Sequence, residues 1–247
     1  MTAIGFPPLF GEARYGLELA RLVASPELRA PRRAGAPPVL LIPGFMAGDA
    51  SLTVLATWLR RRGHRVSTSG IRINMDCAGK AAARLETHLQ AFAADCHGPV
   101  VVIGQSRGGT LARYLATREP ELVCGLATMG SPVLDPLAVS PSVLRAVRSV
   151  ARLGDAGLPG VFSTECADGA CCAGFLSELK APLPAGLRAV AMHSRSDAIV
   201  DWRACLDPHA EQVEVNSSHC GMSVNPEVYR ALERVLAPIE ENQPWNQ

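Results

Sequence analysis

A serine at the centre of a glycine-flanked turn is the residue of this chain that most clearly could do chemistry. Ser106 lies in the stretch 104–108, Gly-Gln-Ser-Arg-Gly, which matches the G-x-S-x-G pattern of a serine on a sharp turn between a strand and a helix. Glycine on either side permits the strained backbone and the close approach of the flanking elements. Such a turn presents the hydroxyl above the positive end of the following helix. The pattern predicts that Ser106 is a nucleophile, and an ordinary glycine-rich turn is the alternative.

The base and the acid that would activate this serine are predicted in two loops near the end of the chain. A serine hydroxyl attacks well only when a base takes its proton, and a carboxylate must hold that base in one tautomer. His219 follows the last predicted strand, and Asp197 follows the strand before it. Because neighbouring parallel strands end at one edge of a sheet, we expect the two loops to meet. His219 is therefore the predicted base and Asp197 the predicted acid, with Asp201 as the rival acid.

Two backbone amides are predicted to stabilise the negative oxygen that develops during acyl transfer. One donor is the residue after the serine, Arg107, and the other comes from a loop that follows an earlier strand. The loop 43–49 follows the apolar run 39–42 and contains Gly44, which permits a turn. The N–H group of Phe45 is the predicted second donor, and that of Met46 is the next candidate. The alternative is that this loop is an ordinary turn with no part in an oxyanion hole.

The elements that must position these residues alternate along the chain between apolar runs and amphipathic stretches. Continuous β-branched runs such as Val100–Ile103 are typical of strands that are buried on both faces of a parallel sheet. The alternation predicts a three-layer α/β fold, a mostly parallel sheet with helices on both faces. The strands are predicted at 39–42, 64–69, 100–103, 122–128, 187–192 and 212–215, and the helices at 12–24, 51–62, 79–94, 107–117 and 226–236.

The stretch 133–184 interrupts this alternation. It contains Asp-Pro and Ser-Pro pairs, a helical stretch at 143–153, a cysteine cluster and a second helix at 174–180. We interpret it as a lid or cap over the edge of the sheet, within a single domain that covers residues 1–247. Its apolar residues would line a pocket if they face the serine and would otherwise form the core of the insertion: Leu144, Val147, Leu153, Leu158, Val161, Phe162 and Phe175.

Taken together, the motifs resemble the lipase and esterase branch of the α/β-hydrolase superfamily, and small bacterial lipases in particular. The resemblance is carried by Ile-Pro-Gly-Phe at 42–45, Gly-Gln-Ser-Arg-Gly-Gly at 104–109, Ser-Asp-Ala-Ile-Val at 196–200 and Ser-His-Cys-Gly at 218–221. It implies an α/β-hydrolase fold, the triad Ser106, His219 and Asp197, and an oxyanion hole from Phe45 and Arg107. Lipases usually have histidine where this chain has Pro43 and Gln105, and hydrolysis needs neither side chain.

Composition excludes several other classes of protein. The 247 residues are 48% hydrophobic and 19% charged, which is typical of a globular protein. A net charge of +1 predicts no nucleic-acid partner, and no apolar run has the length of an integral membrane segment. The first ten residues lack the pattern of a secretory signal, so a cytoplasmic location is expected.

The cysteines leave the option of export open, because disulfides would indicate an oxidising compartment. Cys124 falls in a predicted buried strand and is interpreted as a small apolar residue. Cys205 and Cys220 could be linked, and so could Cys166 with Cys171 or Cys172. The spacing of the last three is not one that zinc sites commonly use, so no metal is predicted. The chain has eight cysteines in all: Cys77, Cys96, Cys124, Cys166, Cys171, Cys172, Cys205 and Cys220.

The sequence therefore predicts a carboxylic-ester hydrolase that needs no cofactor. Its expected partner is a small-molecule ester or a lipid-like substrate, and the oligomeric state is left open. Two alternatives stand beside this hypothesis. An acyltransferase or thioesterase would use the same three residues, and a non-catalytic protein with a hydrolase fold would use none of them.

Overall fold

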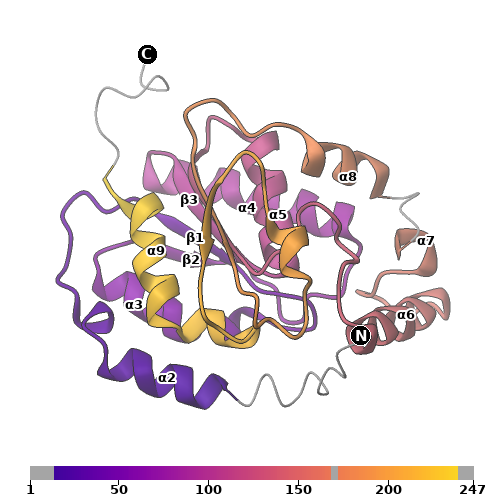
Figure 1. The fold of residues 1–247 in the computed structure, drawn as a ribbon. Helices are drawn as coiled ribbons and strands as arrows, with labels where there is room; N and C mark the ends of the chain where they lie inside the picture. The colour runs from indigo at the N-terminus through magenta and orange to yellow at the C-terminus, as the bar shows by residue number, and fades with distance from the viewer. Residues whose placement is uncertain (1–13, 168–171, 239–247) are drawn as a thin grey trace.

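A computed structural model describes residues 14–167 and 172–238, and within them the chain forms a six-stranded sheet (Figure 1). The order is β2-β1-β3-β4-β5-β6, and every neighbouring pair is parallel. The central strands are buried along their whole length, as their continuous apolar sequences predict. The strands are β1 (Val39–Ile42), β2 (Val66–Thr68), β3 (Val100–Gln105), β4 (Val123–Met129), β5 (Arg188–His193) and β6 (Glu211–Glu214).

Helices cover both faces of this sheet, so the predicted three-layer α/β fold is confirmed. One core lies between the sheet and the helices α2 (Tyr15–Ala24), α3 (Thr53–Arg61) and α9 (Pro226–Leu236). The other lies between the sheet and α4 (Ala78–Cys96), α5 (Arg107–Arg118) and α8 (Ala173–Lys180). The remaining helical segments are α6 (Pro141–Asp155), α7 (Thr164–Ala167) and the short 3-10 turns η1 (Glu27–Arg29), η2 (Asp49–Leu52), η4 (Trp202–Cys205) and η5 (Cys220–Val224).

Several predicted elements start one to three residues from the predicted position, among them the strand at 64–69 and the helix at 51–62. The strand predicted at 64–69 begins only at Val66, because His64 N–H donates to Leu59 O at 3.0 Å and so closes the turn that ends α3. The helix predicted at 51–62 begins with the 3-10 turn η2, and its α-helical part starts at Thr53. Residues 12 and 13 of the predicted N-terminal helix lie outside the described residues.

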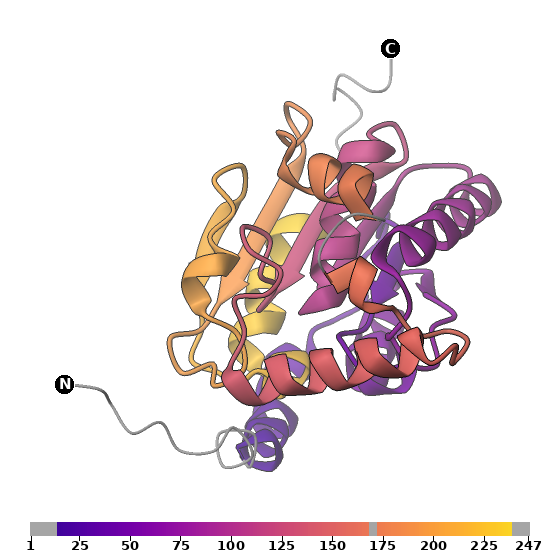
Figure 2. The same ribbon diagram turned by 90° about the vertical axis from the view of Figure 1, so that its right-hand side faces the viewer.

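The stretch 133–184 contains the two predicted helices as α6 and α8, together with the short helix α7 between them. α6 and α7 lie apart from the two layers of helices that sandwich the sheet, and Figure 2 shows α6 running across the end of the molecule toward which the strands point. A lid function for this stretch remains a prediction. Among the helices of the described residues, none combines the length and the apolar character that crossing a membrane requires.

Candidate active site

Ser106 lies between β3 and α5, at the turn that the sequence predicted. Its backbone has φ 53° and ψ −126°, a strained conformation for a residue with a side chain. A Cβ atom on Gly104 would lie 2.2 Å from Gly108 O, and one on Gly108 would lie 2.2 Å from Ile42 O. Only glycine therefore lets the strand, the turn and the helix come this close, and the turn holds the serine at the end of the sheet where the strands finish.

His219 and Asp197 are brought together from the loops that follow β6 and β5. The Nδ1 atom of His219 lies 2.6 Å from Asp197 Oδ2, and the two side chains are only 7% and 1% exposed. The other oxygen of Asp197 accepts hydrogen bonds from Ile199 N–H at 2.8 Å and Val200 N–H at 2.9 Å. The carboxylate is thus fixed by its own loop. This contact favours the tautomer with the proton on Nδ1, in which Nε2 is the nitrogen free to accept a proton.

Asp201, the rival acid, has a different role. Its carboxylate accepts a hydrogen bond from Arg203 N–H at 3.0 Å and caps the turn η4. The side chain is 49% exposed and also pairs with the Arg203 guanidinium at 3.4 Å. The imidazole of His219 is therefore oriented by Asp197 rather than by Asp201.

Ser106 and His219 both line one cavity of about 610 Å³, and the loop 43–48 approaches the serine from β1. A Cβ atom on Gly44 would lie 3.2 Å from Ser106 Cβ, which shows how close this loop comes. Met46 N–H already donates to Asn74 O at 3.2 Å. Within the described residues, the backbone amides of Phe45 and Arg107 donate no hydrogen bond, so the geometry favours Phe45 over Met46 as the second donor.

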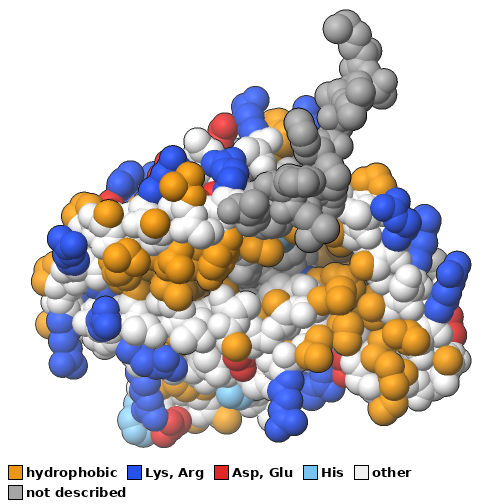
Figure 3. Space-filling view, turned by 90° about the horizontal axis from the view of Figure 1, so that it is seen from below, with side chains coloured by type: hydrophobic (Ala, Val, Ile, Leu, Met, Phe, Trp, Pro, Cys, Tyr) orange, Lys and Arg blue, Asp and Glu red, His pale blue; other side chains and the backbone are white. Residues whose placement is uncertain are grey.

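The rest of the cavity wall is mostly apolar, and much of it comes from the stretch 133–184. Val147, Phe162 and Phe175 line it, as predicted for residues that face the serine. The prediction is wrong for Leu153 and Leu158, which are 52% and 49% exposed and lie neither in the cavity wall nor in a core. Leu144 and Val161 also lie outside the wall. Figure 3 shows hydrophobic side chains gathered on the side of the molecule that is seen from below Figure 1.

Two buried side chains that the sequence analysis did not identify hold the loop of His219. Gln105, which precedes the serine, donates from Nε2 to His219 O at 2.9 Å. Glu18 of α2 is 1% exposed and accepts from Ser218 N–H at 2.7 Å and from Ser218 Oγ at 3.0 Å. Neither role has a local signature, because each contact joins segments more than a hundred residues apart.

The side chain of Arg107 connects the turn of the serine to its surroundings. Its guanidinium donates to Asn74 Oδ1 at 3.0 Å and to Asp76 O at 2.5 Å, and it lies 5.8 Å from the ring centre of Phe162. Burial lowers the pKa of Arg107 from its usual value. Asn74 in turn donates to Pro43 O at 2.8 Å, so one polar network supports both loops that are predicted to form the oxyanion hole.

The cysteines differ from the pairings that the sequence suggested. Within the described residues, Cys205 forms no disulfide with Cys220, and Cys166 forms none with Cys172; Cys171 lies outside those residues. Cys124 is buried in β4, as expected, and burial raises its pKa to about 11. The structure instead brings Cys77, Cys166 and Cys172 together, a group that their spacing in the sequence did not indicate.

Comparison of the sequence with known proteins points to lipases. No family model matches the chain. A triacylglycerol lipase from Burkholderia plantarii is 32% identical over 139 residues, which is 53% of this chain and 38% of that lipase. The match therefore spans well under half of the relative's length.

Comparison with solved structures extends over most of the chain. The mature form of a lipase from Bacillus licheniformis aligns with a TM-score of 0.60 at 12% identity, over 84% of this chain and 94% of that one. An α/β hydrolase from Novosphingobium aromaticivorans aligns with a TM-score of 0.51 at 19% identity, over 85% and 92% of the two chains. At these identities the likeness establishes the fold.

Proposed function

From the premise that this chain is an α/β hydrolase of the lipase and esterase branch, we propose that it is a serine hydrolase that cleaves carboxylic esters with apolar acyl groups. The observation that carries the proposal is the 2.6 Å contact between His219 and Asp197 on the cavity that Ser106 also lines. A buried imidazole that contacts a carboxylate, on a cavity that a strained serine also lines, is an arrangement suited to nucleophilic acyl transfer.

In the proposed reaction, Ser106 Oγ attacks the ester carbonyl while His219 Nε2 takes its proton. Asp197 stabilises the imidazolium that forms, and the amides of Phe45 and Arg107 stabilise the oxyanion. His219 then gives the proton to the leaving alkoxide, so that the alcohol departs and an acyl-enzyme remains. Water activated by His219 attacks the acyl-enzyme and releases the acid and the free serine.

The apolar character of the substrate is inferred from the cavity and from its rim. Met46, Leu134 and Leu137 line the cavity and are also 55%, 49% and 45% exposed. Exposed apolar residues around a cavity mouth are typical of a site that binds an apolar ligand or a lipid-like surface. We propose that the stretch 133–184 acts as the cap that supplies this binding wall.

The test uses Ser106→Ala and the matched control Ser149→Ala, which alters a serine on the exposed surface of α6. We expect Ser106→Ala to lower kcat for p-nitrophenyl esters by about 10⁴-fold or more, and Ser149→Ala to leave it unchanged. A fluorophosphonate probe should label Ser106 in the unaltered chain, as mapped by mass spectrometry. Undiminished turnover by Ser106→Ala would contradict the proposal.

Product analysis in the presence of an alcohol acceptor separates hydrolysis from acyl transfer. A series of esters from acetate to long acyl chains defines the acyl-chain length that the enzyme prefers.

A further inference from the structure

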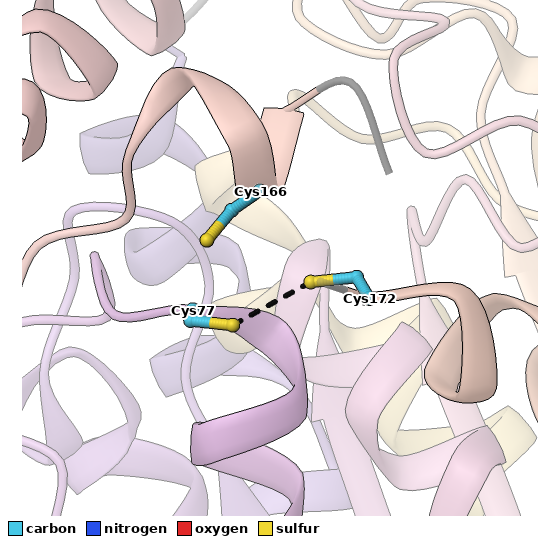
Figure 4. A group of neighbouring side chains, drawn as sticks. All are labelled: Cys77, Cys166 and Cys172. Atoms are coloured by element: carbon cyan, nitrogen blue, oxygen red, sulfur yellow. Dashed lines mark hydrogen bonds between the residues drawn. The ribbon is translucent and has the colours of Figure 1, made fainter. Parts of the chain in front are cut away.

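Three cysteine side chains from separate elements converge beside the cavity (Figure 4). Cys77 directly precedes α4, Cys166 lies on α7, and Cys172 directly precedes α8. Their Sγ atoms all lie within 4.8 Å of one another, and those of Cys77 and Cys172 are 3.5 Å apart. Figure 4 shows the sulfur of Cys166 pointing toward the other two.

We propose that Cys77, Cys166 and Cys172 bind one Zn²⁺ ion or a similar thiophilic divalent cation. Zinc bound by thiolates has Zn–S distances of about 2.3 Å, which places two sulfurs of one tetrahedral site about 3.8 Å apart. The 3.5 Å between Cys77 and Cys172 is close to this value. A disulfide requires about 2.05 Å and would use only two of the three sulfurs. The convergence of all three therefore favours a shared metal ion.

The charges around the group suit a bound cation. Cys77 and Cys172 are 7% and 4% exposed, so three bare thiolates would be unfavourable there. Metal binding would replace the protons on the three sulfurs with one cation. Three thiolates and one divalent cation leave a single negative charge. The guanidinium of Arg107, which lines the same cavity as Cys166 and Cys172, would offset that charge.

Such an ion would connect the stretch 133–184 to the body of the fold. Cys166 and Cys172 belong to that stretch, whereas Cys77 belongs to the start of α4, which packs against the sheet. Cys166 and Cys172 also line the cavity. Among the described residues three ligands converge, and the fourth tetrahedral position would be filled by a further donor, such as water from the cavity. The ion would therefore fix the part of the wall that α7 and α8 supply.

The experiment is metal analysis of the full chain, purified under reducing conditions, followed by removal of the metal with a chelator and titration with Co²⁺. We expect about one equivalent of bound metal, and on titration the charge-transfer absorption of Co²⁺–thiolate bonds. Serine in place of Cys77, Cys166 or Cys172 should weaken Co²⁺ binding by about 100-fold or more. The matched control is Cys96→Ser at the other end of α4, which should bind as the unaltered chain does.

Two results would overturn the proposal. One is the absence of the thiolate band when the reduced, unaltered chain is titrated with Co²⁺, a measurement that does not depend on any variant folding. The other is a Cys77–Cys172 disulfide in peptide maps of the non-reduced chain, which would make the group a redox pair. Repeating the titration on Ser106→Ala separates this proposal from the ester hydrolase, because the metal should bind whether or not the serine reacts.

Discussion

Replacing Glu18 should damage both the stability of the fold and the chemistry at His219, because this one carboxylate holds the loop that carries the histidine. Glu18 accepts hydrogen bonds from Ser218 N–H at 2.7 Å, Ser218 Oγ at 3.0 Å and Ser217 Oγ at 3.3 Å. All three donors are buried. The residue after Ser218 is the proposed base, so a shift of this loop moves the imidazole directly.

The loss of stability in Glu18→Ala depends on which of these buried donors keep a hydrogen-bond partner. In Glu18→Ala the Ser217 hydroxyl keeps its bond to Ser218 O at 2.9 Å, whereas the Ser218 amide loses its acceptor. A buried donor without a partner costs about 1–3 kcal/mol, and the lost charge-assisted bonds bring the total to about 3 kcal/mol. At about 2–4 °C per kcal/mol for a chain of this size, Tm should fall by about 6–12 °C. Glu18→Gln keeps one acceptor oxygen, so its loss of stability should be about a third of that of Glu18→Ala.

The assay measures Tm, kcat and KM for Glu18→Ala, Glu18→Gln and the control Arg21→Ala, which alters an exposed residue of the same helix. At 20 °C, where the variants remain folded, kcat of Glu18→Ala should fall about 10- to 100-fold through misplacement of the imidazole. KM should change little, since Glu18 lies outside the cavity wall. A purely structural role would lower Tm and leave kcat unchanged.

A double-mutant cycle with Gly221 tests the same contact from the other side. A Cβ atom on Gly221 would lie 1.3 Å from Glu18 Oε2, so Gly221→Ala must displace the carboxylate or the loop. Its loss of stability should be smaller in the Glu18→Ala background, where that oxygen is gone. Equal losses in the two backgrounds, or a Tm for Glu18→Ala within 1 °C of the unaltered chain, would refute the reasoning.

Three further predictions concern other buried polar groups. Asp197→Asn should lower kcat for esters by about 10³- to 10⁴-fold with KM nearly unchanged, because an amide does not fix the tautomer of the proposed base His219. Activity close to that of the unaltered chain would contradict the proposal that Asp197 is the acid. The Nε atom of Arg113 lies 2.5 Å from Asp207 Oδ2, and both side chains are buried. Arg113→Met leaves the carboxylate without its partner and should lower the free energy of unfolding, measured in urea, by about 3–5 kcal/mol. Adding Asp207→Leu should recover much of that loss. Burial lowers the pKa of His64 in the folded chain below 6.5. As the pH falls, the unfolded chain therefore takes up this proton before the folded chain does. The free energy of unfolding should fall as the pH drops below about 6.5. In His64→Gln that slope, measured by urea titration between pH 5 and 8, should be shallower.

Much of the fold could be predicted because its signals are local. β1 occupies Val39–Ile42 and α9 occupies Pro226–Leu236, the same bounds that the apolar run and the helix-opening proline indicated. Ser106, His219 and Asp197 could be proposed together from the sequence, because chain order and strand ends determine which loops meet at the edge of a parallel sheet. That inference needs no knowledge of side-chain packing.

The contacts that support the site could not be predicted in the same way. Glu18 lies in an amphipathic helix, where a carboxylate ordinarily faces solvent, and its burial depends on a loop 200 residues away. The three converging cysteines come from the starts of two helices and from a third short helix, so their spacing carries no metal-site pattern. Leu153 and Leu158 have the composition of a pocket wall, and only the course of α6 decides that they are exposed.

Gln105 shows how this chain accommodates its main departure from the usual lipase motif. Lipases usually have histidine at this position, directly before the nucleophile, whereas here the amide of Gln105 donates to His219 O. Together with Glu18 and Asp197, it holds the loop of the proposed base, and all three side chains are nearly buried. If the proposed reaction centre is fixed this firmly, we expect different ester substrates to meet the same catalytic geometry. Selection among esters should therefore reside in the apolar wall supplied by the stretch 133–184, and substitutions there should change KM and acyl-chain preference before they change kcat.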